Sequence, residues 1–144
     1  MKPIDILNET HLKRTSCREG ILKVMLESNE ALSENEIRER LEGNYDRTTF
    51  YRSFKTLEEN HIVHKIIIDA SLTKYALEEQ YLEIGPLHSE KETTSMHAHF
   101  HCQQCNTVKC IPLKDCPTPV LPEGYLIDHF ELIVKGTCQL CNLN

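Results

Sequence analysis

The chain has 144 residues, of which 40% are hydrophobic, and its formal net charge at pH 7 is −6. This length fits one ordinary domain or two small ones, and the longest apolar run is too short for a helix that crosses a bilayer. The acidic balance excludes strong nonspecific binding to nucleic acid, although Lys and Arg side chains within residues 13–23 and 47–55 form local basic clusters.

Three helices are predicted in the first half of the chain from apolar residues at helical spacing, over residues 15–28, 33–41 and 47–59. The second helix opens with a capping box, with Ser33 as the N-cap and Glu36 three positions later. The third helix buries three apolar residues at i, i+4 and i+7, which are Phe50, Phe54 and Leu57.

Two strand-like runs follow, over residues 61–68 and 73–77, and the residues 69–71 between them form a hairpin turn. Three helices followed by a β-hairpin is the arrangement of a winged helix-turn-helix domain. We therefore assign residues 1–80 to a winged-helix domain that binds DNA.

Residues 81–96 lack periodicity and contain turn residues, so they are predicted to be an interdomain linker. The pattern beyond them favours strands over 97–102, 107–112 and 125–134, while four prolines within 112–122 disfavour a long helix there. The expected fold class is α+β, with a small α/β dimerisation domain over residues 97–144.

The third helix offers a surface that suits entry into a DNA groove. Its outward side chains combine hydroxyls, a phenol, a guanidinium and an ammonium group, from Thr48, Thr49, Tyr51, Arg52 and Lys55. Arginine can bond two acceptors of a guanine, and Thr and Tyr can reach thymine methyls or phosphates. The alternative is an ordinary solvated helix face, and the flanking helix and hairpin favour the DNA-binding interpretation.

Two CxxC pairs predict a structural zinc site in the second domain, formed by Cys102, Cys105, Cys138 and Cys141. Four thiolates close a tetrahedral site and leave no open position for catalysis. The N-terminus has no apolar segment of a signal peptide, so we expect a cytoplasmic protein whose seven cysteines are reduced. Buried thiols or redox pairs are the alternative interpretation of the CxxC motifs.

A second metal site is indicated by His97 and His99, which are two residues apart on a predicted strand and therefore point to one face. Imidazoles at this spacing can chelate one ion, although a histidine pair on an exposed strand can also be plain polar surface. His101 shares the face and is a weaker candidate ligand.

Taken together in chain order, these motifs resemble the ferric-uptake-regulator (Fur) family of repressors. The resemblance is carried by Leu12-Lys13 with Thr15 and Arg18, by Thr49-Phe50-Tyr51-Arg52 with Leu57 and Ile62-Val63, and by both cysteine motifs with His97, His99 and Gly136. It implies a dimeric, metal-dependent repressor that binds a double-stranded DNA operator. It also implies that Tyr51 and Arg52 contact the operator, that Lys13 approaches the minor groove, and that Arg18 belongs to the DNA-binding set.

The sensory ligands depart from the family pattern. Residues 29–32 lack the family's histidine, Ala76 stands near its wing ligand, and Cys110 replaces its acid after the first CxxC. The remaining regulatory set is His97, His99 and Cys110 with His129, which matches a late histidine of the family, and with Cys116 and His64 as possible partners. Cys17, where the family commonly has proline, is interpreted as a small buried residue.

A thiolate among imidazoles favours zinc over ferrous iron, so the expected cofactors are one structural zinc and a second, regulatory divalent metal. Iron sensing is the first alternative, peroxide sensing is less favoured, and a zinc-ribbon interaction module is a further alternative. An enzyme would need catalytic zinc on His97, His99 and Cys110, with Glu131 as base, and no pocket motif supports it. We expect neither an enzyme nor a small-molecule substrate or membrane partner.

Overall fold

The computed structural model describes residues 1–78, 81, 97–112, 119–128 and 130–143. The chain divides into two compact units, Met1–Ser89 and Glu90–Asn144, and each contains its own β-sheet, so the fold is α+β as predicted. None of the helices in the described ranges has the length and apolar character needed to span a membrane. The predicted linker lies outside the described residues apart from Tyr81, which packs into the core of the first unit.

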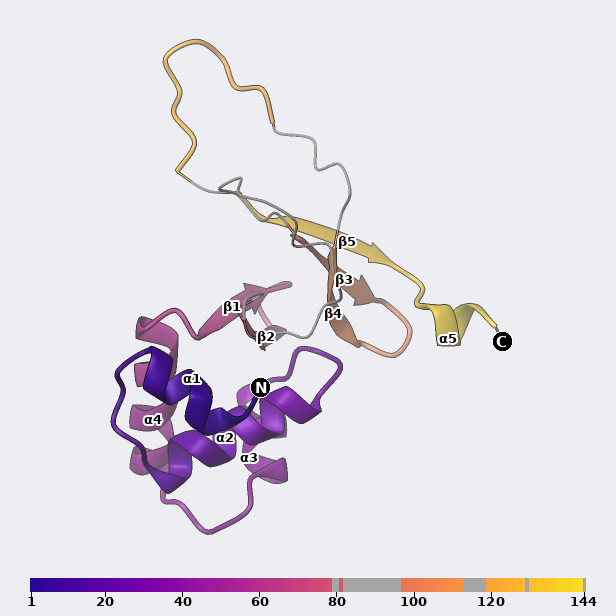
Figure 1. The fold of residues 1–144 in the computed structure, drawn as a ribbon. Coiled ribbons are helices and arrows are strands. Elements are labelled where there is room, and N and C mark those ends of the chain that lie inside the picture. The colour runs from indigo at the N-terminus through magenta and orange to yellow at the C-terminus, as the bar shows by residue number, and fades with distance from the viewer. Residues whose placement is uncertain (79–80, 82–96, 113–118, 129, 144) are drawn as a thin grey trace. The chain divides into compact units, whose positions relative to one another are not determined.

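Helices gather in the first unit and are followed by one antiparallel hairpin (Figure 1). Its elements are α1 (Pro3–Glu9), α2 (Ser16–Glu27), α3 (Glu34–Arg40), α4 (Arg47–Glu59), β1 (Val63–Ile67) and β2 (Thr73–Leu77). This is the winged helix-turn-helix arrangement that the sequence predicts, with α4 as the recognition helix and the β1–β2 hairpin as the wing. Helix α1 is an addition to the prediction, and it buries Ile6 and Leu7 against the other helices.

Side-chain caps fix where the three predicted helices begin. The Thr15 hydroxyl accepts from the Arg18 N–H at the start of α2, and the Ser33–Glu36 capping box forms at the start of α3. Asp46 Oδ1 accepts from the Thr49 N–H at 3.1 Å at the start of α4. Each cap satisfies a backbone donor that the helix itself leaves without a partner, which explains why these boundaries can be read from the sequence.

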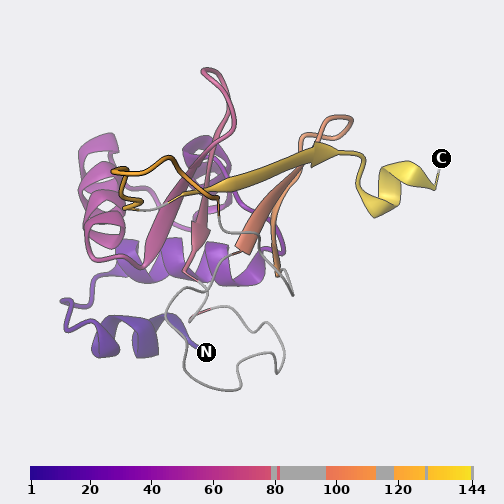
Figure 2. The same cartoon turned by 90° about the horizontal axis from the view of Figure 1, so that it is seen from above.

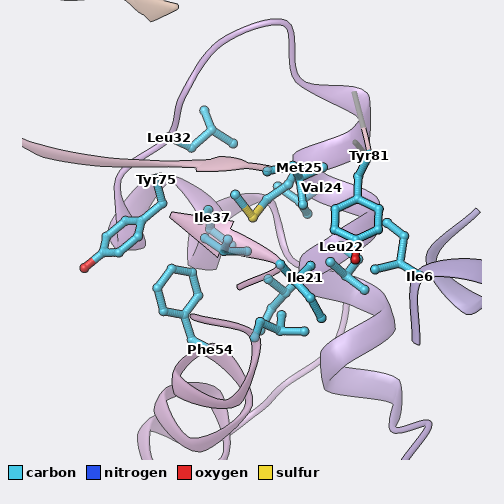
Figure 3. Packing of buried hydrophobic residues seen from close by; sticks show 14 of the residues in the cluster. Ile6, Ile21, Leu22, Val24, Met25, Leu32, Ile37, Phe54, Tyr75 and Tyr81 are labelled. Atoms are coloured by element: carbon cyan, nitrogen blue, oxygen red, sulfur yellow. The ribbon is translucent and has the colours of Figure 1, made fainter. Parts of the chain in front are cut away.

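The core of the first unit lies between the four helices and the wing (Figure 3). Apolar side chains from all of these elements are fully buried, among them Ile21, Leu22, Ile37, Leu57 and Ile66. Helices α2 and α3 approach closely at Gly20, where a Cβ atom would stand 2.8 Å from Leu41 Cδ1. This packing holds the recognition helix on a rigid scaffold.

The wing is tied to the start of α3 by backbone and side-chain bonds. Leu32 and Tyr75 exchange both backbone hydrogen bonds, with N–O distances of 2.9 and 2.7 Å. Lys74 Nζ lies 2.8 Å from one carboxylate oxygen of Glu36 and 3.0 Å from the other. The same carboxylate accepts from the Ser33 N–H at 2.8 Å, so Glu36 serves the cap and the wing together.

Glu36 is expected to make folding pH-dependent. Burial alone would raise the pKa of Glu36, but bonds from Lys74 and the Ser33 N–H outweigh it and hold the pKa below the ordinary value of 4.5. Because the folded-state pKa is depressed, its stabilisation is complete above pH 4.5 and is lost as the pH falls through the folded pKa. Urea unfolding should therefore show that the wild-type protein has a larger free energy of unfolding than Glu36→Gln at neutral pH, and that this difference shrinks as the pH falls. A difference that stays constant with pH would contradict this.

The second unit contains a three-stranded sheet and a short terminal helix. Its elements are β3 (His97–Cys102), β4 (Val108–Pro112), β5 (Leu132–Gly136) and α5 (Gln139–Asn142), with strand order β4-β3-β5. Strand β3 pairs antiparallel with β4 and parallel with β5. Figure 2 shows β5 as a straight strand that leads into α5 near the C-terminus.

The strand predicted over residues 125–134 is wrong in its extent, since β5 covers only Leu132–Gly136. The parallel pairing of β3 with β5 explains the difference. Its first registered pair is Ala98 with Leu132, and β3 begins only one residue before Ala98. Within the described ranges, the residues before β5 have no strand to pair with, and Tyr125 and Leu126 are 68% and 93% exposed. The two predicted strands that flank the first CxxC turn are confirmed as β3 and β4.

Candidate metal centres and DNA-reading surface

The first CxxC motif forms the tight turn between β3 and β4. Cys102 is the last residue of β3, its carbonyl accepts from the Asn106 N–H at 2.9 Å, and its own N–H bonds to the Thr107 carbonyl at 2.9 Å. Asn106 closes the turn with a φ of 61°, a left-handed conformation that asparagine tolerates better than most residues. This geometry brings the Cys102 and Cys105 side chains to one end of the sheet.

The second CxxC motif reaches the same end through the parallel pairing of β3 and β5. Cys102 pairs with Gly136, so Cys138 follows two residues beyond the ladder, and Cys141 is on α5. The four sulfur atoms all lie within 4.8 Å of one another, and those of Cys105 and Cys138 are 3.8 Å apart. Sulfurs around a tetrahedral zinc at ~2.3 Å stand roughly 3.8 Å apart, so this four-cysteine cluster fits zinc.

Protonation of the four thiols shows why a cation suits this cluster. N–H groups of Cys105, Cys138 and Gln104 point at Cys102 and lower its pKa to about 6, while the Thr107 hydroxyl lowers that of Cys105. The pKa of Cys141 rises to about 12, chiefly because its thiol bonds to Cys138. Four thiolates cannot ionise together at this spacing without a cation, and zinc replaces the protons on binding.

His99 and Cys110 form a second pair of metal-ligating side chains on the same sheet. They are registered partners on β3 and β4, and Cys110 Sγ lies 3.5 Å from His99 Nδ1. His99 is 4% exposed and Cys110 is half-buried. An imidazole and a thiol at this distance can share one ion, and their chemistry suits a borderline-soft metal such as zinc.

Of the other predicted sensory residues, the structure describes the side chain of His101 but not those of His97, His129 and Cys116. His101 is buried, and its Nε2 lies 3.2 Å from Asn106 Oδ1, so it supports the turn that carries the zinc cysteines. His97 begins β3, but its side chain, like the whole of His129 and Cys116, lies outside the described part of the chain. The ligand roles of His97 and His129 therefore stay predictions.

His64 stands on the wing, directly across the β1–β2 ladder from Ala76. Its side chain is half-buried, and its Nδ1 lies 3.7 Å from Glu78 Oε1. This distance is longer than that of a hydrogen bond, so the two groups form an ion pair when the imidazole is protonated. The sequence offered His64 only as a possible partner, and the proximity of Glu78 was not predicted.

Helix α4 presents the outward surface that its periodicity predicts. Phe50, Phe54 and Leu57 are buried, and the exposed residues are Thr48, Thr49, Tyr51, Arg52 and Lys55. At the N-terminus of the helix, bonds from the Thr49 hydroxyl and N–H hold the pKa of Asp46 below its ordinary value. The Arg38 guanidinium, which the sequence did not single out, stands 5.5 Å from the centre of the Phe50 ring.

A basic cleft of about 400 Å³ joins α4 to the start of α2. Arg18 from α2 and Arg52 and Lys55 from α4 line it, together with hydroxyl-bearing residues and Glu59. Arg18 Nη1 donates to the Lys13 carbonyl at 2.7 Å, which fixes the segment that carries the exposed Lys13 side chain. Cations and hydroxyls gathered in this way match the oxygens of a nucleic-acid backbone.

Comparisons with known proteins agree with this architecture. The sequence matches the model of the ferric uptake regulator family over residues 9–118, which is more than half of the chain. A comparison with curated proteins gave no match.

Solved structures with the same fold include a zinc uptake regulator complexed with zinc and DNA, with 22% identity, a TM-score of 0.64, and coverage of 97% of this chain and 90% of that one. The Helicobacter pylori ferric uptake regulator has 17% identity and a TM-score of 0.56, covering 96% and 88%. The Vibrio cholerae ferric uptake regulator has 18% identity and a TM-score of 0.58, covering 93% and 98%. These identities establish a shared fold, and the family match establishes that the chain belongs to the ferric uptake regulator family of metal-responsive transcriptional regulators.

Proposed function

We propose that the protein is a zinc-responsive repressor that binds double-stranded operator DNA as a homodimer in the cytoplasm. The observation that carries the choice of metal is the His99–Cys110 pair, whose Nδ1 and Sγ atoms are 3.5 Å apart on adjacent strands. A hard ferrous site prefers carboxylate and imidazole ligands, whereas a thiolate with an imidazole favours zinc. The four-cysteine cluster is proposed as a second, permanently filled zinc site.

Further regulatory ligands come from the sequence and from the surroundings of individual residues. His97 is two residues before His99 on β3, and His129 and Cys116 remain candidates from sequence alone. His64, which lies on the wing, is a further candidate from the sequence.

Operator binding is assigned to α4 and the cleft beside it. Tyr51 and Arg52 would contact base edges, while Lys13, Arg18 and Lys55 would contact phosphates. Thr48 and Thr49 are exposed on the first turn of the helix, where a recognition helix makes its base contacts.

Dimer formation is assigned to the second unit, where a second copy of the chain would cover its exposed apolar side chains. The most exposed of these are Val120, Tyr125, Leu126, Leu140 and Leu143. Covering these side chains with a second copy would remove apolar surface from water and so favour association. A dimer presents two copies of α4, which can enter successive major grooves of one operator.

Zinc would act by a population shift towards the conformation that binds DNA. A coupling of this kind is typically ~1–3 kcal/mol, equivalent to a roughly 5- to 150-fold change in affinity. We expect zinc to tighten binding to a DNA duplex that the zinc-loaded protein selects from a random pool. Fluorescence anisotropy with and without zinc measures this, and equal affinities in the two conditions would refute a zinc-responsive regulator.

Arg52→Ala is expected to weaken binding to the selected duplex by about 1–3 kcal/mol and to relax the preference for one base pair. Arg52 is exposed on α4, so its loss should leave the fold unchanged. Lys109→Ala, which removes an exposed cation from β4, is the control and should bind as the wild type does. Unchanged affinity of Arg52→Ala would favour a zinc-ribbon protein-interaction module.

Iron sensing is the second candidate, because other members of the family are ferric uptake regulators. The two metals are separated by titrating the apo protein with zinc and, without oxygen, with ferrous iron. Zinc is expected to restore DNA binding at lower free concentration, and the opposite order would favour the iron sensor.

A further inference from the structure

Lys74 is a buried cation on the wing, and its side chain meets the partly exposed carboxylate of Glu36. It is 7% exposed and is the one lysine or arginine that is buried among the described residues. Its ammonium group meets both oxygens of the Glu36 carboxylate, at 2.8 and 3.0 Å. The pair joins residues 38 positions apart in sequence, one on the wing and the other on α3.

The same junction holds the recognition helix through Tyr75, the next residue on β2. The ring of Tyr75 meets that of Phe54 edge-on, with centroids 4.6 Å apart, and Figure 3 shows the two rings side by side. The Tyr75 hydroxyl lies 3.2 Å from Glu34 Oε1, and burial together with that carboxylate raises the pKa of Tyr75 to about 12. Tyr75 is thus a neutral hydrogen-bond donor that links the wing to α3 and α4.

A buried ion pair is a poor source of stability. Removing two charges from water costs about as much as their attraction returns, and a hydrophobic replacement of similar size is often neutral or stabilising. What a buried pair does supply is a defined geometry, since the ammonium must stay on the carboxylate that neutralises it. The Lys74–Glu36 pair is therefore one of the contacts that hold the wing against α3, beside the backbone bonds of Leu32 with Tyr75.

The wing carries one exposed lysine, on the face that also carries Tyr75 and opposite to the face of Lys74. Lys65 is exposed on β1 and is registered across the ladder from Tyr75, the neighbour of Lys74. Asp69 Oδ1 closes the wing tip by accepting from the N–H groups of Ser71 and Leu72, at 2.8 and 2.9 Å. The hairpin is therefore internally defined, and its orientation depends on the junction with α3.

We propose that Lys74 is a positioning residue for operator binding, which with Glu36 holds the wing so that Lys65 contacts a phosphate of the DNA backbone. This inference rests on the DNA binding proposed above. Lys74 itself is buried and makes no contact with DNA, so its effect on affinity passes through Lys65.

The test measures affinity for the duplex selected by the wild-type protein, over a series of salt concentrations, together with thermal unfolding. Lys65→Gln should weaken binding several-fold and lower the slope of log K against log salt by about one, because one phosphate contact is lost. Lys74→Met removes the ammonium partner of Glu36 and should lower the unfolding temperature at neutral pH, and it should show the same weakening and the same lower slope as Lys65→Gln. Lys74→Arg, which keeps the charge, should bind as the wild type does.

The double variant Lys65→Gln/Lys74→Met decides between positioning and an independent effect. It should bind no more weakly than Lys65→Gln, because Lys74 acts through Lys65. The inference is overturned if Lys74→Met keeps the wild-type affinity and salt slope. It is also overturned if the double variant loses affinity by the product of the two single losses. If Lys74→Met does not fold, Glu36→Gln should show the same weakening and lower slope, and it keeps the cap because its amide oxygen can still accept from the Ser33 N–H.

The wild-type protein separates this inference from the proposed function. If it selects no duplex in the presence of zinc, the proposed DNA binding fails. If it binds and the variants at Lys65 and Lys74 bind equally well, only the role of the wing is refuted.

Discussion

Cys138→Ser is expected to release the structural zinc and to unfold the second unit while the winged helix stays folded. A structural zinc contributes about 10–16 kcal/mol of apparent binding free energy at neutral pH, and a typical domain is stable by only ~5–15 kcal/mol. The second unit has little else to compensate, because its sheet has three short strands and most described side chains of β5 and α5 are at least partly exposed. Loss of the metal should therefore remove more free energy than this unit has in reserve.

Metal analysis and hydrogen exchange together measure this outcome. The variant should hold one zinc fewer per chain, amides of β3 and β5 should lose protection, and those of α2 and α4 should keep it. Cys17→Ala is the matched control, since Cys17 is buried in the core of the first unit and its loss should leave the metal content unchanged. Full zinc content together with protected β5 amides in Cys138→Ser would show that the four sulfurs do not form the site.

The helices of the first unit were predictable because their signals are local. Ser33 and Glu36 cap α3 using donors within three residues, and the spacing of Phe50, Phe54 and Leu57 identifies the buried side of α4 without knowledge of what it meets. Helix α1 escaped prediction because it is only seven residues long and has only two buried residues. Its stability comes from packing against α2, which no local pattern records.

The candidate sensory site was predictable only in part, because some of its surroundings come from residues distant in the sequence. The CxxC turn fixes how β3 and β4 pair, so the spacing of His99 and Cys110 already implied that they are close. Strand β5 was misjudged because a parallel partner 34 residues away sets its start. The pairing of His64 with Glu78, and of Lys74 with Glu36, depends on long-range geometry of this kind and left no pattern in the sequence.

Cys110→Ala is expected to abolish the response to zinc without disturbing the fold. Cys110 is half-buried on β4 and lies outside the four-cysteine cluster, so its loss removes one ligand of the regulatory site and leaves the structural zinc in place. The protein should then hold one tightly bound zinc after treatment with a mild chelator, and no exchangeable metal. Its affinity for the selected duplex should stay at the metal-free value, so the roughly 5- to 150-fold gain expected of the wild type disappears.

Cobalt substitution reports on Cys110 directly, because a thiolate bound to cobalt absorbs in the near ultraviolet and an imidazole does not. Wild-type protein with zinc in its four-cysteine site should gain this absorption when cobalt fills the regulatory site, and Cys110→Ala should not. His99→Ala should lose the exchangeable metal as well, because its Nδ1 is the partner 3.5 Å from the Cys110 sulfur. Lys109→Ala, the neighbouring change on the opposite face of β4, is the control and should keep both metals and the zinc response. An unaltered zinc response in Cys110→Ala would remove the thiolate from the sensory site, and with it the argument for zinc over iron.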